Sequence, residues 1–373
     1  MPTTSPQDPY AVYRGTGEVR ALHRFDVQTL EDYLCDRLAG FERPLSVRQF
    51  NGGQSNPTYS LGSPAGNWVL RRKPPGELLP SAHAVDREYR VIAALGLVGY
   101  PVPRADLLCE DESIVGTAFY VMEQVEGRVL WDPLLPDQRP DERRAIYNSL
   151  IDAMAELHQA DYEAIGLGDF GRPGNYFAAI GLGDFGRPGN YFARQINRWS
   201  KQYVASETEN VPEMNRLMEW LPANVPEDDS VSLVHGDFKL DNTIVHPTEP
   251  RVIAVLDWEL STLGHPLGDL TYMLSSRQLS QSPFAGLSDD NLMALGIPTD
   301  REFVERYSKT TRRSFDDGLD FYIAYNLFRT AAIYQGILGR VRDGTAASAN
   351  VTGTGDVRPI ALRAMDFARK LGA

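Results

Sequence analysis

The first third of the chain changes repeatedly between helical and strand-like spacing of its apolar residues. From Val27 to Leu38 the apolar residues recur at helical spacing after Asp26, which can cap a helix, and Gly40 follows. Beyond this helix, short apolar runs separated by Gly- and Asn-rich turns are typical of strands. The pattern predicts strands at 47–50, 58–61, 68–71, 107–108 and 118–122, and a helix at 84–95.

The remainder of the chain has mainly helical patterning, with short strands expected at 231–234 and 252–256. Thr299 and Glu302 form a capping-box pattern at the start of one helix. Further helices are expected at 319–338 and 358–371. We therefore expect an α+β protein with a small antiparallel sheet, a linker and a larger helical lobe. The expected divisions are a flexible tail at 1–20, an N-lobe at 21–122, a hinge at 123–127 and a C-lobe at 128–373.

One segment of the chain is duplicated perfectly. Residues 164–178 are repeated without change at 179–193. A solenoid needs about three or more copies of a larger unit, so the duplication does not indicate a repeat fold. The Gly and Pro residues of the segment indicate a loop, where an insertion is tolerated because the entropy of loop closure grows slowly with length. We expect one copy to fill the structural position and the other to bulge out.

Composition and charge exclude several classes of protein. With 373 residues and 42% hydrophobic residues, the chain can bury ordinary cores, and no apolar run reaches the length of a membrane span. Cys35 and Cys109 cannot form a disulfide framework, and the N-terminus lacks a signal-peptide pattern, so we expect a cytoplasmic protein. The net charge of −13 argues against nucleic-acid and membrane partners. The oligomeric state stays open.

Two acidic strings carry the chemistry of phosphate transfer. His235, Asp237 and Asn242 fit the pattern H-x-D-x-x-x-x-N directly after the strand at 231–234, and Asp257 ends the strand at 252–256. Transfer from ATP needs a carboxylate at the acceptor hydroxyl and oxygen ligands for Mg²⁺. We expect Asp237 to serve as the catalytic base or to orient the acceptor hydroxyl, and Asn242 and Asp257 to hold Mg²⁺.

These strings resemble the aminoglycoside phosphotransferase superfamily, whose fold is similar to that of protein kinases. The resemblance rests on residues 235–242, 257–259 and 264–270. One branch is similar in further segments: the phosphotransferase domain that occurs alone in bacteria and fused to acyl-CoA dehydrogenases in some animal proteins. Those segments are 51–59, 69–76 and 328–337. The resemblance implies a bilobal protein-kinase-like fold, with His235 packing the catalytic loop and Asp269 holding it.

ATP or GTP is the expected nucleotide. Gly52, Gly53 and Ser55 lie in a turn whose N–H groups and hydroxyl could face phosphates, although the same turn suits a plain hairpin. The chain has no P-loop string. The resemblance implies a hinge in which the adenine meets backbone groups of Glu123 and Val125.

A kinase also needs cations at the phosphates. Arg71 and Lys73 share one face of the strand that starts at Trp68, so either could supply the charge. The resemblance places Arg71 where protein kinases have lysine and makes Glu88 its helix partner. Lys239 stands where many protein kinases have a lysine that meets the γ-phosphate; here it could do that or contact the acceptor.

The acceptor side has weaker signals. Arg329 and Arg340 are eleven residues apart on one helix and share a face, which would suit a carboxylate, phosphate or CoA group. Ion pairing with the chain's many carboxylates is the alternative. The predicted function is an ATP- and Mg²⁺-dependent small-molecule kinase, with a hydroxyacyl-CoA or another acidic hydroxy compound as acceptor. An aminoglycoside or amino-alcohol phosphotransferase, and a pseudokinase without turnover, stay open as alternatives.

The duplicated segment gives a direct test. Deleting residues 179–193 leaves one intact copy, so we expect activity and melting temperature to stay almost unchanged. Each doubling of a flexible loop costs only about 0.6 kcal/mol, which limits the effect. Differential scanning calorimetry and a turnover assay measure both quantities. A large loss of either would show that both copies are needed.

Overall fold

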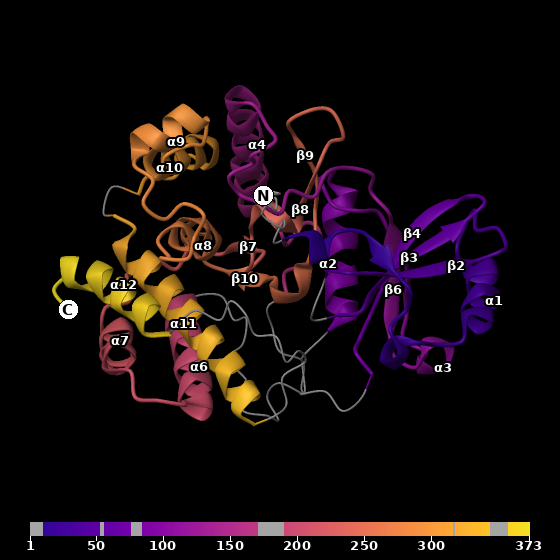
Figure 1. The fold of residues 1–373 in the computed structure, drawn as a ribbon, viewed down its shortest axis with the longest axis horizontal. Helices are drawn as coiled ribbons and strands as arrows, with labels where there is room; N and C mark the ends of the chain where they lie inside the picture. The colour runs from indigo at the N-terminus through magenta and orange to yellow at the C-terminus, as the bar shows by residue number, and fades with distance from the viewer. Residues whose placement is uncertain (1–9, 53–55, 76–83, 171–189, 316–317, 344–356) are drawn as a thin grey trace, which may run out of the picture. The chain divides into compact units, whose positions relative to one another are not determined.

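The computed structural model describes residues 10–52, 56–75, 84–170, 190–315, 318–343 and 357–373 (Figure 1). The chain divides into two compact units. The first unit comprises residues 1–132, 163–167 and 240–260, and the second comprises residues 133–162, 168–239 and 261–373. The predicted lobe and hinge boundaries themselves stay a prediction.

A six-stranded sheet forms the frame of the first unit, with the strand order β1-β2-β3-β4-β6-β5. Every neighbouring pair is antiparallel, as the sequence pattern predicts. Thr16 and Gly17, within the predicted tail, form β1 and pair with β2. The elements are β1 Thr16–Gly17, α1 Val27–Arg37, β2 Ser46–Phe50, β3 Thr58–Ser63, β4 Gly66–Arg72, α2 Val85–Leu97, β5 Ala105–Cys109, α3 Glu112–Val115 and β6 Phe119–Glu123.

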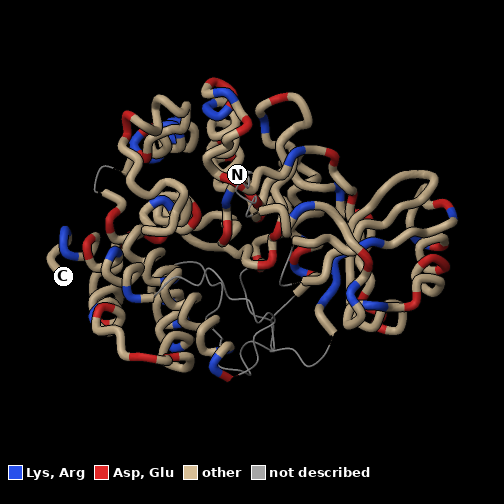
Figure 2. The backbone as a smooth tube through the Cα atoms, in the orientation of Figure 1, with Lys and Arg blue, Asp and Glu red and all other residues tan. Residues whose placement is uncertain are grey.

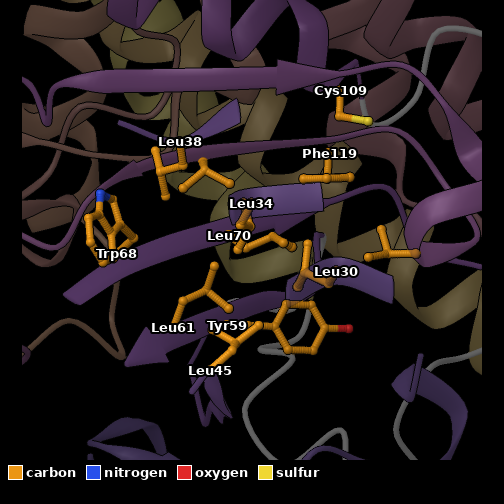
Figure 3. Close-up of a cluster of buried hydrophobic side chains, with 12 residues drawn as sticks. Leu30, Leu34, Leu38, Leu45, Tyr59, Leu61, Trp68, Leu70, Cys109 and Phe119 are labelled. Carbon is orange, nitrogen blue, oxygen red and sulfur yellow. The ribbon is translucent and has the colours of Figure 1, made fainter. Parts of the chain in front are cut away.

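Helix α1 packs on one face of this sheet and forms the core of the first unit (Figure 3). Leu30 and Leu34 point from the helix toward Tyr59 and Leu61 of β3 and Leu70 of β4, and all five are fully buried. The strand residues alternate in sequence because successive side chains of a strand point to opposite faces. Helical spacing on one side and alternation on the other therefore build this core.

The other side chains of β4 follow the same alternation. Arg72 points to the α1 face, where its Nε donates to Tyr59 Oη at 3.0 Å and its Nη2 donates to the carbonyl of His23 at 3.1 Å. Arg71 points to the opposite face, toward Glu88 of α2. The sheet thus separates a hydrophobic face under α1 from a face that carries charged groups under α2.

A second, smaller hairpin belongs to the first unit. Strands β8 (Thr243–Val245) and β9 (Val252–Val255) pair antiparallel. The N–H of Val255 donates to the carbonyl of Pro101 at 2.8 Å, and the ring of Trp258 packs edge-on against Tyr100 at 6.1 Å. These contacts fix the hairpin to the segment that follows α2.

The second unit is mainly helical around a two-stranded ribbon of β7 and β10. Helix α11 is buried along most of its length and contacts α6, α8 and α12 (Figure 1). The predicted capping box at Thr299 and Glu302 is present, with both reciprocal hydrogen bonds. The elements are α4 Pro140–Gln159, α6 Tyr191–Ser206, α7 Pro212–Ala223, β7 Ser232–Val234, β10 Thr262–Gly264, α8 Leu267–Arg277, α9 Asp289–Leu295, α10 Asp300–Thr311, α11 Asp320–Arg342 and α12 Val357–Lys370.

The described residues draw on both copies of the duplicated segment. Leu167 and Phe170 of the first copy are buried, and Phe192 of the second copy is buried near the start of α6. Residues 171–189 lie outside the described residues, so the predicted bulge of one copy stays a prediction.

Charged side chains of both signs are interspersed along the backbone (Figure 2). The net charge of −13 therefore does not reflect one uninterrupted acidic stretch. In the described part of the chain, no helix combines the length and the apolar character needed to cross a bilayer.

Candidate active site

Asn242 and Asp257 lie at the same end of the β8–β9 hairpin. Asn242 immediately precedes β8, and Asp257 follows β9 by two residues. The N–H of Leu256 donates to the carbonyl of Asn242 at 2.8 Å, which makes the two segments direct neighbours. The backbone of Asp257 has a φ of 66°, a left-handed conformation that non-glycine residues seldom adopt. Such strain often accompanies functional positions.

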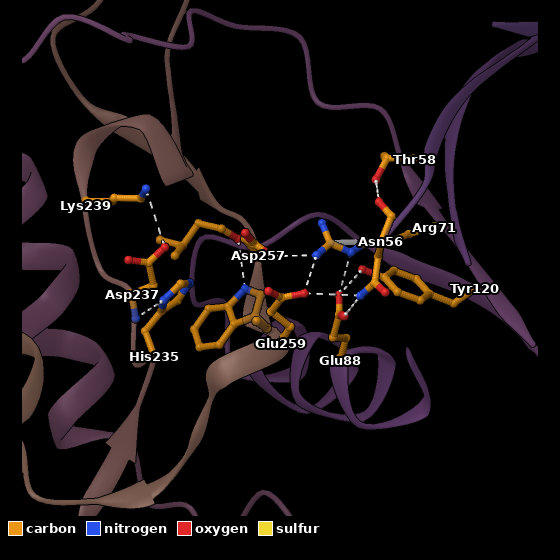
Figure 4. Close-up of polar contacts among 12 residues, drawn as sticks. Asn56, Thr58, Arg71, Glu88, Tyr120, His235, Asp237, Lys239, Asp257 and Glu259 are labelled. Atoms are coloured by element: carbon orange, nitrogen blue, oxygen red, sulfur yellow. Dashed lines mark hydrogen bonds and ion pairs between the residues drawn. The ribbon is translucent and has the colours of Figure 1, made fainter. Parts of the chain in front are cut away.

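The guanidinium of Arg71 faces three carboxylates (Figure 4). Its Nε lies 2.9 Å from Oε2 of Glu88 in α2. Its Nη2 lies 2.5 Å from Oδ1 of Asp257 and 3.3 Å from Oε2 of Glu259. Arg71 and Glu88 are buried, whereas Asp257 and Glu259 keep part of their side chains in solvent. One positive charge is therefore surrounded by an excess of negative charge.

The pKa of Glu88 is shifted by this environment. Burial raises its pKa to about 7: the nearby Arg71 lowers the value, while the carboxylates of Asp257 and Glu259 raise it further. Tyr120 donates its hydroxyl to Oε2 of Glu88 at 3.1 Å. Glu88 is therefore held in place by hydrogen bonds in addition to its ion pair with Arg71.

The expected pair of Arg71 and Glu88 is thus present. Lys73, the other candidate cation, continues the strand, and its N–H donates to the carbonyl of Ala118 at 3.1 Å. Sequence reasoning missed Asn56, whose Nδ2 donates to Glu88 Oε1 at 2.8 Å and to Glu259 Oε2 at 3.3 Å. Its position as the last residue of the predicted Gly-rich turn at 51–56 was the available signal. Which cation meets the phosphates stays a prediction.

In the second unit, the carboxylate of Asp269 holds the catalytic loop by accepting hydrogen bonds from the loop's backbone. Oδ2 accepts the N–H of His235 at 2.7 Å, and Oδ1 accepts the N–H of Gly236 at 2.8 Å. Burial by itself raises the pKa of Asp269, but hydrogen bonds from His158 and from the backbone of His235 outweigh it and lower the pKa. The ring of His235 is fully buried, and its Nδ1 accepts the N–H of Asp237 at 3.2 Å. These contacts give His235 and Asp269 the structural roles that the resemblance implies.

Asp237 projects from this loop beside Lys239. Nζ of Lys239 lies 3.5 Å from Oδ2 of Asp237, and both side chains are partly exposed (Figure 4). Tyr272 of α8 also contacts Asp237: burial raises the pKa of Tyr272, and the Asp237 carboxylate raises it further. Asp237 and Lys239 belong to the second unit, whereas Asn242 and Asp257 belong to the first. The predicted convergence of all four on one phosphate stays a prediction.

Arg329 reaches the same loop from α11. Its Nη2 donates to the carbonyl of Gly236 at 2.7 Å, and its guanidinium carbon lies 5.1 Å from the ring centre of Tyr272. Arg340, expected on the same helix face, is exposed near the end of α11, and its predicted contact with the acceptor stays a prediction. The residues do share a helix face, but the last turn of α11 is exposed rather than buried in the core.

Arg198 is a basic residue that sequence reasoning missed. It lies on α6, is exposed, and has its guanidinium carbon 5.2 Å from the ring centre of Trp199. Burial by surrounding protein atoms lowers its pKa, and the positive charge of Arg329 lowers it further. Arg198 therefore adds positive charge close to that of Arg329.

The other nucleotide candidates lie in the first unit. Gly52 is tightly packed, because a Cβ there would lie 3.2 Å from both the carbonyl of Tyr13 and the ring of Trp131. Gly53 and Ser55 lie outside the described residues. Glu123 ends β6, and its N–H donates to the carbonyl of Arg104 at 2.9 Å. The predicted adenine contacts of Glu123 and of Val125, which follows the strand, stay predictions.

Comparison with known proteins places the chain in a family. The model of the phosphotransferase enzyme family matches residues 46–307. Acyl-CoA dehydrogenase family member 11 of Gallus gallus is 42% identical over 378 residues, which cover 97% of this chain and 46% of that protein. The probable acyl-CoA dehydrogenase IBR3 of Arabidopsis thaliana is 41% identical over 88% of this chain and 41% of its own length. The chain thus spans less than half the length of these two relatives.

Solved structures of phosphotransferases are also similar to this chain. A crystal structure from Ralstonia eutropha, described as a candidate aminoglycoside phosphotransferase, is 47% identical, with a TM-score of 0.80 over 93% of this chain and 99% of that chain. Aminoglycoside phosphotransferase APH(4)-Ia, in ternary complex with ADP and hygromycin B, is 15% identical with a TM-score of 0.57 over 92% and 99% of the two chains. The latter likeness supports the fold alone.

The chain belongs to the phosphotransferase enzyme family, within the aminoglycoside phosphotransferase superfamily and its kinase-like fold. This family is one of phosphotransferases. The predicted family and fold class are thereby confirmed.

Glu88 gives a prediction about stability and pH. Its pKa rises from 4.5 to about 7 on folding, so the folded protein binds this proton more tightly than the unfolded chain does. The resulting stability is fully present below pH 4.5 and is lost as pH rises through about 7. Relative to Glu88→Gln, the wild type should lose about 1–3 kcal/mol of unfolding free energy across this window.

Urea titrations of the nucleotide-free protein at a series of pH values measure this difference. Glu110→Gln, an exposed change of the same kind in the first unit, should follow the wild-type pH profile. Parallel profiles of the wild type and Glu88→Gln would contradict the assigned environment of Glu88.

Proposed function

We propose that this chain is an ATP- and Mg²⁺-dependent kinase that transfers the γ-phosphate to a hydroxyl group of a small anionic molecule. The observation that carries the proposal is the cluster of Arg71, Glu88 and Asp257 within one unit, with Asn242 at the same hairpin end. A cation paired with a helix glutamate, beside a strand-end aspartate, is the arrangement that kinases use to position nucleotide phosphates.

Asn242 and Asp257 fit a magnesium site. One supplies an amide oxygen and the other a carboxylate oxygen, which are ligands that Mg²⁺ accepts together with water and phosphate oxygens. Bound there, Mg²⁺ would neutralise charge on the phosphates. Asp257 would exchange its contact with Arg71 for the metal, which leaves Arg71 available to the phosphates.

Asp237 is proposed to accept the proton of the acceptor hydroxyl, and Lys239 to meet the transferred phosphate. The backbone hydrogen bonds to Asp269 support this role because they hold the loop that carries Asp237. A nucleotide is supported by the family and by the ADP found in the distant APH(4)-Ia complex. The adenine would lie at the backbone of Glu123 and Val125.

An anionic acceptor, such as a hydroxyacyl-CoA, is supported by two observations. Arg329 contacts the catalytic loop. The exposed Arg198 of α6 lies near Arg329. Both curated relatives are named as acyl-CoA dehydrogenases, and this chain matches less than half of each. An aminoglycoside acceptor is the second candidate, because the Ralstonia protein is described in those terms.

Substitution of the proposed base tests the chemistry. Asp237→Asn should lower kcat by about 10²–10⁴-fold while ATP affinity is retained, since the side chain acts on the acceptor proton. Removal of Mg²⁺ with EDTA should abolish turnover. ATP consumption coupled to ADP detection measures the rate, and Asp290→Asn, an exposed change in the same unit, is the control. Nucleotide binding without turnover in the wild type would identify a pseudokinase instead.

The acceptor class is tested with a panel of hydroxyacyl-CoAs and aminoglycosides. We expect turnover of the acyl-CoAs, and a rise in their KM of about tenfold in Arg198→Ala, because a charge-assisted hydrogen bond is lost. Arg301→Ala removes an exposed charge from α10 of the same unit and should leave KM unchanged. Turnover of aminoglycosides with inert acyl-CoAs would reject the anionic acceptor.

A further inference from the structure

A cavity of about 450 Å³ lies entirely within the second unit, outside the residues assigned to phosphate transfer. It opens between the end of α7, the loop that precedes β7 and the start of α11. The side chains that define its chemistry are Trp220, Glu227, Asp228, Asp320, Phe321 and Tyr322.

Aromatic side chains belong to the lining of this cavity. The rings of Trp220 and Phe321 lie 6.0 Å apart at a tilt of 42°, and Phe321 meets Tyr322 edge-on at 5.5 Å. Phe321 and Tyr322 are buried, so their positions are fixed by packing, whereas Trp220 keeps partial exposure. The lining therefore contains the rings of Phe321 and Tyr322, which are fixed by packing, and the ring of Trp220, which is partly open to solvent.

Three carboxylates also belong to the lining. Glu227 and Asp228 are exposed in the loop before β7, and Asp320 begins α11, where Lys370 lies 3.0 Å from its Oδ1. His265 lies 2.9 Å from Oδ2 of Asp228, and burial lowers the pKa of His265. The described lining contains no lysine or arginine. No basic residue of the lining therefore neutralises the carboxylates of Glu227 and Asp228.

The cavity is separate from the catalytic loop. Strand β7 runs between them, with Asp228 before its start and His235 after its end. Along α11, Tyr322 precedes Arg329, which contacts Gly236, by seven residues, or about 10 Å of helix. A ligand in the cavity would therefore not occupy the position of the phosphate acceptor.

We propose that this cavity is a second binding site, which takes an organic cation with an ammonium or methylated ammonium group. Ring faces attract such cations through their quadrupoles, and methylated ammonium groups are recognised by aromatic cages. Glu227 and Asp228 supply the opposite charge. A bare metal ion fits less well, because the described residues contain no group of three His, Cys, Asp or Glu side chains placed to hold one.

The test uses tetramethylammonium, which has no hydroxyl and cannot accept a phosphate, and tert-butanol, a neutral molecule of similar shape. Saturation-transfer NMR on the full chain at constant ionic strength follows the methyl signal of each probe. We expect saturable binding of tetramethylammonium and none of tert-butanol. Trp220→Ala and Glu227→Gln should each weaken binding about tenfold.

Two controls locate the site. Glu219→Gln makes the same charge change next to Trp220 but outside the lining, and should bind tetramethylammonium as the wild type does. Asp237→Asn should also bind it unchanged, since the catalytic loop is not involved. Glu227→Gln alters an exposed residue and keeps the test valid if Trp220→Ala fails to fold.

Four outcomes would overturn the proposal. Absence of saturable transfer, equal binding of tert-butanol, or an equal loss of affinity in Glu219→Gln would each show that the cavity does not select a cation. A loss of binding in Asp237→Asn alone would place the cation at the acceptor site instead.

Discussion

The ion cluster around Arg71 is the contact on which the first unit's chemistry depends. A buried guanidinium is costly unless it is paired, and Glu88 of α2 supplies the pair. Asp257 and Glu259, from the end of the small hairpin, then add negative charge beyond what one arginine neutralises. Strand β4, helix α2 and the hairpin end are therefore joined through one side chain.

The catalytic loop of the second unit is fixed by a different device. Asp269 accepts hydrogen bonds from the backbone N–H groups of His235 and Gly236. Arg329 donates a hydrogen bond to the carbonyl of Gly236, the residue directly before Asp237. Gly236 has a φ of 85°, which favours glycine at that position. Hydrogen bonds thus hold the loop backbone at two N–H groups and at one carbonyl, while the side chain of Asp237 stays partly exposed.

Much of this could be anticipated because the signals are local. Because side chains alternate along β4, Arg71 and Arg72 are expected on opposite faces of the sheet. In the structure, Arg71 pairs with Glu88 on one face and Arg72 donates to Tyr59 on the other. The loop pattern likewise indicates His235 and Asp269 as supports once the family resemblance is recognised. Arg340 shows the limit of periodicity: it shares a helix face with Arg329, but burial depends on what packs against that face.

The sequence by itself determined the sheet, the buried α11 helix and the catalytic strings, because these follow from residue spacing and strand alternation. The pairing of Arg71 with Glu88 was implied by the family resemblance. Only the tertiary structure decided that Asn56 and Glu259 join that pair, that Arg198 lies beside Arg329, and that rings and carboxylates from α7, a loop and α11 enclose a cavity. The physical reason is distance along the chain: such groups meet only through packing, which no local pattern encodes.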